Sequence, residues 1–150
     1  MATYIEIVEE VKDFLVTRID LLDESTSFVG DIEAVMNGLY ADKDISVGLV
    51  VDFLNSLPHA NASGDRVRDI WDTNIAGILI AQFEGRDDTE DVKNNLLNAL
   101  WRAFDGGHSK ILSGTDMVSI VVIERPQKTK IGEHPFYYLP FTMKVTHGGK

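Results

Sequence analysis

The stretch from Ile78 to Gly107, ILIAQFEGRDDTEDVKNNLLNALWRAFDGG, decides the fold of this chain. It opens with apolar residues on both faces of an extended segment, which is typical of a strand covered on both sides. From Thr89 to Asp105 the apolar residues recur every three or four positions, which predicts an amphipathic helix. The apolar stripe of this helix is formed by Val92, Leu96, Leu97, Leu100, Trp101 and Phe104. A strand that leads into a long helix indicates a fold that mixes both kinds of element.

A second amphipathic helix is expected near the start of the chain, from Thr3 to about Leu22. Its apolar residues also follow the three-and-four spacing, and Thr3 with Glu6 fits a capping box. Acids occupy the opposite face of this helix and also crowd the start of the helix that begins at Thr89. In both places they suit the positive end of the helix dipole, so a solvated helix face explains them without a ligand.

Two strands are expected between these helices. The first covers Ile45 to Leu54, where apolar residues alternate with small or polar ones. The second covers Arg66 to Glu84 and lies in the sheet interior, with Gly77 at a bend or bulge. Residues 55–65 form a long loop or the tip of an extended hairpin. Residues 23–44 allow a short helix capped by Asp31 or an irregular strand.

Two further strands close the chain, at Met117–Arg125 and Phe136–Val145. The ten residues between them are long for a plain hairpin turn. Pro140 removes one ladder donor, so the last strand is expected at an edge or bulged there. The whole order predicts a single α+β domain over residues 1–150. It has a mostly antiparallel sheet of about four strands, an N-terminal helix, a long helix between the strand pairs, and long hairpin arms.

The chain is acidic, and its charge is unevenly distributed. It has 150 residues, a formal net charge of −10 and no cysteine, which excludes disulfides, thiol nucleophiles and thiolate metal sites. Residues 1–60 carry a net charge of −9, residues 61–105 carry −4, and residues 106–150 carry +3. The excess of acids argues against a general nucleic-acid coat. The asymmetry allows copies to stack or form rings, with an acidic surface facing a basic one.

The sequence shows no targeting or membrane segment. The first residues lack the basic and apolar regions of a signal peptide, and no apolar run approaches the length of a membrane span. We therefore expect a protein that is made in the cytosol and used there or assembled there into something larger.

No catalytic or metal-binding signature stands out. No histidine has ligand spacing, and both His108, after a glycine pair, and His147, in the C-terminal tail, are expected to be exposed. The acidic run 84–91 lacks the order of an EF-hand loop. Asp69 and Asp72 form a carboxylate pair with no cleft to place them in. Because a nucleophile elbow and a phosphate-binding glycine loop are also missing, we expect neither an enzyme nor a cofactor or metal.

The layout resembles the tail terminator proteins of long-tailed bacteriophages. The resemblance rests on the strand-to-helix stretch quoted above, followed by the strand pair MVSIVVIER and FYYLPFTMKV. It covers about residues 45–147, with the first helix added, and residues 23–44 look like an addition relative to shorter members. It is a distributed pattern and not a single motif.

The resemblance implies a structural virion protein that does no chemistry. Its subunits would form a hexameric ring that caps the tail tube and joins it to the neck, after assembly in the host cytoplasm. The implied partners are other copies of the chain, the tail tube protein and a neck or connector protein. DNA would pass through an acidic lumen without specific binding, and no membrane is involved.

The long arms and the acidic helix surfaces are the candidate interaction sites under this interpretation. The subunit or tube interface is expected to include Leu57, Pro58, His59, Arg66, Arg68, Arg125, Lys128, Lys130, Phe136 and Tyr138. The acidic lumen or docking face is expected to include Glu6, Glu9, Glu10, Asp13, Asp87 and Asp88.

Three other functions remain open from the sequence. Another neck, connector or tail-completion protein would have the same small α+β appearance. A small acidic binding or inhibitor module would present its acidic face to a basic partner as a monomer. An enzyme is the third possibility, and a deep pocket with perturbed carboxylates would favour it.

Overall fold

The computed structural model describes residues 4–19, 22, 26–32, 47–58, 70–82, 89–104, 110–113, 116–131 and 134–148. Two helices and seven strands are defined within these residues. In chain order they are α1 (Tyr4–Arg18), β1 (Ser27–Val29), β2 (Val47–Pro58), β3 (Ile70–Gln82), α3 (Thr89–Ala103), β4 (Lys110–Ser113), β5 (Asp116–Ile123), β6 (Gln127–Ile131) and β7 (His134–Gly148).

The strands form one mixed sheet in the order β1-β2-β3-β7-β5-β4, with β6 also paired to β7. Only β1 and β2 pair in parallel among the described strands. The expected α+β class is therefore confirmed. The four expected strands correspond to β2, β3, β5 and β7, and the count of about four omits the short strands β1, β4 and β6.

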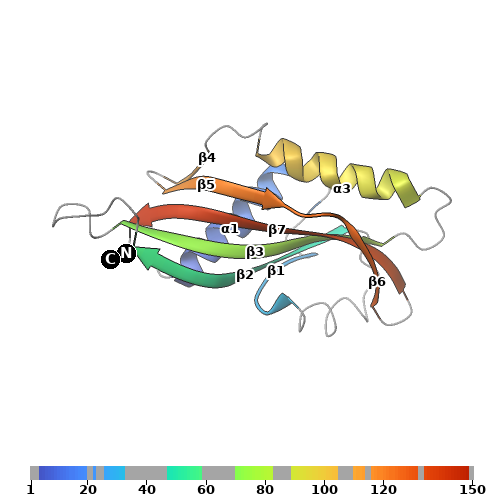
Figure 1. The fold of residues 1–150 in the computed structure, drawn as a ribbon, viewed down its shortest axis with the longest axis horizontal. Helices are drawn as coiled ribbons and strands as arrows, with labels where there is room; N and C mark the ends of the chain where they lie inside the picture. The colour runs from blue at the N-terminus through green and yellow to red at the C-terminus, as the bar shows by residue number, and fades with distance from the viewer. Residues whose placement is uncertain are drawn as a thin grey trace.

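Both described helices cover the same face of the sheet. Figure 1 shows α1 crossing behind the sheet and α3 lying along its upper border. Their C-terminal turns meet, because the Arg18 guanidinium donates a hydrogen bond of 3.2 Å to the Ala103 carbonyl. The Phe14 and Phe104 rings pack with their centroids 5.9 Å apart. The predicted long helix and N-terminal helix thus enclose one continuous core against the sheet.

The opposite face of the sheet carries a second, smaller core. Val50, Ile78, Ile80 and Phe136 are buried there, with Phe28 and Ile32 packed against them. Burial of both Ile78 and Leu79 confirms the prediction that the centre of this strand is covered on both faces. The short helix considered after Asp31 lies, beyond Ile32, outside the described residues.

Gly77 makes room for an aromatic ring and does not mark a bulge. It pairs directly with Val51 on one side and Phe141 on the other, with no break in either register at this position. A Cβ atom built on Gly77 would lie 2.3 Å from Cζ of Phe141. The expected bend or bulge at this position is wrong; the irregularity in the neighbouring strand lies between Phe53 and Asn55.

The last two long strands form one extended hairpin with a break in the middle. Ile123 of β5 pairs with Phe141, and Gln127 of β6 pairs with Tyr138. Between them the Glu124 amide donates a 2.9 Å hydrogen bond to the Pro140 carbonyl. Because proline has no N–H to donate, the break in pairing falls where the ladder lacks a donor.

This arrangement corrects three expectations. Residues 127–131 form β6, so most of the expected connector at 126–135 is strand. β7 lies inside the sheet between β3 and the β5–β6 segment, so the edge alternative for Pro140 is wrong. β2 continues to Pro58, opposite Trp71, and so takes up part of the segment expected as loop or hairpin tip.

Candidate interaction surfaces

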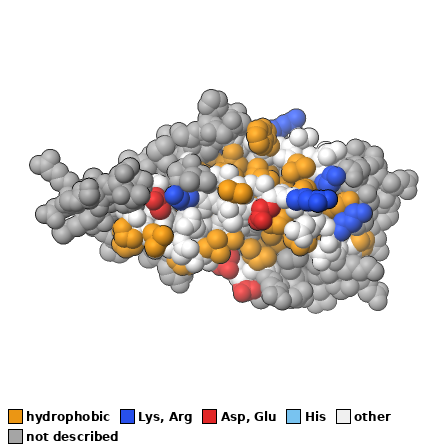
Figure 2. Space-filling view, viewed as in Figure 1, with side chains coloured by type: hydrophobic (Ala, Val, Ile, Leu, Met, Phe, Trp, Pro, Cys, Tyr) orange, Lys and Arg blue, Asp and Glu red, His pale blue; other side chains and the backbone are white. Residues whose placement is uncertain are grey.

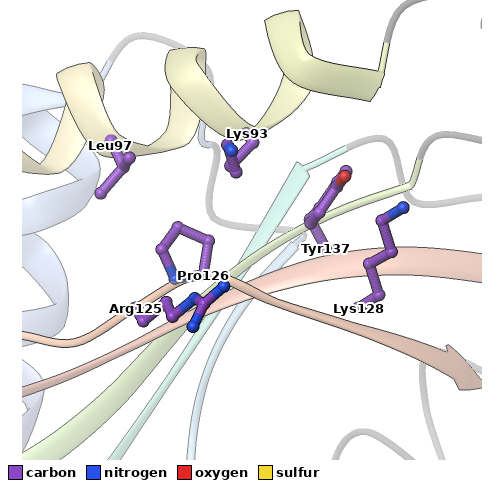
Figure 3. Close-up of a pocket in the computed structure, with 6 residues that line it drawn as sticks. All are labelled: Lys93, Leu97, Arg125, Pro126, Lys128 and Tyr137. Atoms are coloured by element: carbon purple, nitrogen blue, oxygen red, sulfur yellow. The ribbon is translucent and has the colours of Figure 1, made fainter.

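A groove lies between α3 and the broken hairpin, and its volume is about 370 Å³. We call it the cationic groove. It is lined by Lys93, Leu97, Arg125, Pro126, Lys128 and Tyr137. Figure 3 shows the α3 side chains pointing down toward the strands, Pro126, Lys128 and Tyr137 rising from the hairpin, and Arg125 lying along it.

The local fold explains how these residues meet. Lys93 and Leu97 are four residues apart and therefore lie on one side of α3. Arg125 and Pro126 occupy the break between β5 and β6, where the chain leaves the ladder. Lys128 and Tyr137 are direct cross-strand partners, and the Lys128 ammonium lies 5.5 Å from the centre of the Tyr137 ring. That distance is within the range of a cation–π interaction.

The groove is positively charged, although the chain as a whole is acidic. Three of its lining residues are cationic, and none of the described lining residues is acidic. Arg125 and Lys128 are exposed, whereas Lys93 is half-buried and Tyr137 is buried. Figure 2 shows Lys and Arg side chains gathered at the end of the molecule where β6 lies. Such a surface can bind carboxylate or phosphate oxygens by charge-assisted hydrogen bonds.

The solvent side of α1 forms a second surface, with the opposite charge, which we call the acidic face of α1. It consists of Glu6, Glu9, Glu10 and Asp13. All but the half-buried Glu10 are exposed. The Lys12 ammonium lies 3.4 Å from Glu9 Oε2 and 3.9 Å from Asp13 Oδ1, so one cation offsets part of this charge. The helix therefore keeps an acidic stripe on the side away from the core.

Large apolar side chains are exposed at several places. Leu54 and Leu57 are 50% and 58% exposed near the end of β2, and Val122 of β5 is 51% exposed. Figure 2 shows hydrophobic side chains scattered across the sheet face opposite α1. Trp101 of α3 is 62% exposed, which corrects its placement in the apolar stripe that faces the core.

His147 is part of a buried polar chain at the end of the sheet. It is 7% exposed, so its expected exposure in a loose tail is wrong. Its Nδ1 lies 2.8 Å from the Gly148 carbonyl, and its Nε2 lies 2.5 Å from the Thr73 hydroxyl, which in turn contacts the Ser56 hydroxyl. A carbonyl can only accept, so in the neutral ring Nδ1 carries the proton and Nε2 accepts from Thr73. These contacts satisfy a buried imidazole and hold three strands together.

Asp72 has a similar structural environment on the other face of the sheet. It is buried, and the Thr146 hydroxyl donates a 2.7 Å hydrogen bond to its Oδ1. Asp69, its partner in the carboxylate pair considered from the sequence, lies outside the described residues.

The structure places the predicted interface residues that it describes at several different positions. Arg125 and Lys128 meet in the cationic groove, while Leu57 and Pro58 are exposed at the far end of β2. Tyr138 is half-buried and donates a hydrogen bond of 2.8 Å to Gln127 Oε1, and Lys130 belongs to β6. The structure does not describe His59, Arg66, Arg68, Asp87 and Asp88.

The expectation that Phe136 belongs to the subunit or tube interface is wrong. Its side chain is 0% exposed and belongs to the second core, so it has no surface to offer a partner. The sequence analysis missed Lys93, Leu97 and Tyr137 as lining residues. Their meeting depends on the packing of α3 over the hairpin, and the only local signal was the four-residue spacing of Lys93 and Leu97.

The described residues contain no group of three His, Cys, Asp or Glu side chains placed to hold a metal ion. None of the described helices is long and apolar enough to cross a membrane.

Comparisons with known proteins give distant structural similarities. No family model and no curated protein matches the chain. A solved structure described as the sheath/tube terminator of an extracellular contractile injection system in its extended state aligns at 11% identity with a TM-score of 0.46. The alignment covers 100% of this chain and 58% of that one, so the chain spans less than two thirds of its length.

A protein from Akkermansia muciniphila aligns at 10% identity with a TM-score of 0.35, over 99% of this chain and 80% of the other. At these identities and scores, neither protein defines the fold or the function of this chain.

Proposed function

We propose that this chain is a structural subunit of a tail-terminator-like ring. Copies assemble into a hexamer that caps a tail tube and meets a neck or connector protein. The protein performs no catalysis and binds no cofactor. It is made in the host cytoplasm and becomes part of the virion, and DNA passes through its lumen without specific binding.

One observation carries the proposal, namely the order and packing of the elements. The buried strand β3 precedes the long helix α3, and α3 packs over the final strand pair, with α1 on the same face. The order of these elements is the one on which the resemblance to tail terminators rests. The separation of an acidic helix face from a cationic groove adds support, because two surfaces of opposite charge on one chain suit contacts between neighbouring copies.

The test is whether the purified protein stops the growth of tail tubes. Tube protein is polymerised with and without this chain, and tube length is measured by electron microscopy together with co-sedimentation. We expect the chain to bind at one tube end and to limit tube length. Tubes that grow unchanged and sediment without the chain would contradict the proposal.

The same preparation separates the alternatives. A neck or tail-completion protein would bind a preassembled capped tail and not a growing tube. A small acidic inhibitor module would instead form a salt-sensitive one-to-one complex with a basic partner and would stay monomeric.

A further inference from the structure

We infer that the cationic groove binds the acidic face of α1 of a second copy of this chain. The inference rests on the proposed ring and names the surfaces that join its neighbours. The first observation is the groove itself, which brings together the cations Lys93, Arg125 and Lys128. The chain as a whole has a net charge of −10, so this cluster of cations is unusual for it.

The groove is suited to a helix that carries several carboxylates along one side. It is open at the protein surface and runs between a helix and a hairpin (Figure 3). On α1, Glu6, Glu9 and Asp13 follow three- and four-residue spacing and lie along one side of the helix. At 1.5 Å per residue they span about 10 Å, so a single helix can offer several carboxylates to the two exposed cations at once.

The acidic face cannot fill the groove of its own chain. The C-terminal turn of α1 is tied to the C-terminal turn of α3 through Arg18 and Ala103. The acids lie in the first part of α1, and Lys93 and Leu97 place the groove in the earlier part of α3. In Figure 1, α1 begins at the left of the molecule and α3 begins at the right, so these two parts lie far from each other. The occupant therefore comes from another molecule.

Contact between two different surfaces of the same chain is head-to-tail. Such a contact leaves a free groove on one copy and a free acidic face on the other, and it closes into a ring when the rotation allows. Opposite charge at the contact also raises the rate of encounter and suppresses wrong pairings.

The experiment reverses the charge of each surface separately. The groove variant carries Arg125→Glu and Lys128→Glu, and the helix variant carries Glu9→Lys and Asp13→Lys. Self-association is measured by sedimentation velocity over a range of protein concentrations, at about 20 mM and about 300 mM salt, where screening is weak and strong. Arg102→Glu and Asn98→Lys are the controls, because both residues are exposed outside the two surfaces.

We expect the wild-type chain to self-associate more strongly at low salt, and each reversed variant to associate at least about tenfold more weakly. An equimolar mixture of the two variants should regain association, because the acidic groove of one then faces the basic helix of the other. The mixed assembly should contain the two variants in strict alternation, and the controls should behave as the wild type does.

Three results of the association experiment would overturn the inference. They are a wild-type chain that stays monomeric at low salt, reversed variants that associate as the wild type does, and a mixture that does not recover. Circular dichroism shows whether each variant is folded, and Arg125→Glu alone replaces the groove variant if the loss of Lys128 from the Tyr137 ring disturbs the fold. Tubes capped equally well by the reversed variants would remove this interface and leave the proposed function intact. Charge-dependent association without tube binding would support this interface and contradict the proposed function.

Discussion

At the scale of single residues, Gly77 and Phe141 pack closely across β3 and β7. The ring of Phe141 occupies the space where any other residue at position 77 would place its Cβ atom. We expect Gly77→Ala to lower the free energy of unfolding by about 1–3 kcal/mol, because the added methyl group forces the ring or the strand to move. Chemical denaturation followed by circular dichroism measures this change.

Gly148→Ala is the control for that substitution, since a Cβ atom there meets nothing within 4 Å. It should change stability by no more than about 0.5 kcal/mol. In a Phe141→Leu background the cost of Gly77→Ala should shrink, because the atoms that clash are gone. An equal cost in both backgrounds would show that the penalty has another cause.

At the scale of elements, α3 is held to the sheet by one side only. Leu96 and Leu100 are buried under it, and Trp101 points away with most of its surface exposed. Leu100→Ala should cost about 2–5 kcal/mol by leaving a cavity. Trp101→Ala should change stability by no more than about 0.5 kcal/mol, although tryptophan is the larger side chain. Thermal and denaturant unfolding of both variants would test this, and a large loss from Trp101→Ala would contradict the described packing.

The sequence predicted the long elements well because their patterns are local. The α3 stripe and the alternation in β7 depend on residues a few positions apart, so both could be recognised from the sequence. β6 was not predicted, because two prolines and a glycine around the sequence KTKI are typical of a loop. Only pairing with β7 makes it a strand. His147 was misplaced for the same reason, since its burial depends on Thr73, which lies 74 residues earlier.

Only part of the cationic groove could be predicted from the sequence. Arg125 and Lys128 were selected because they are basic residues beside a predicted arm. Lys93 was not, because nothing in its own helix indicates which strand it approaches. Trp101 fitted the helical period but lies at the border of the buried stripe, where a period alone cannot decide exposure.

At the scale of the whole molecule, the sheet should open from its borders inward. β3 and β7 each have strand neighbours on both sides along most of their length, whereas β1 and β4 are short outer strands. We expect amide hydrogens in residues 75–81 and 137–145 to exchange at least about tenfold more slowly than those of β1 and β4. Hydrogen exchange read by mass spectrometry measures this difference. Equal protection across all strands would mean that the sheet opens only by global unfolding.

The backbone hydrogen bond from the Glu124 amide to the Pro140 carbonyl has a consequence for how the length of this hairpin can vary. Pairing on the two sides of it is separate, with β5 on one side and β6 on the other. Two residues added or removed at the tip would lengthen or shorten the β6 part and leave every β5 partner unchanged. The reach of this arm can therefore differ among related chains while the core is kept, so that one body can serve neighbours of different size.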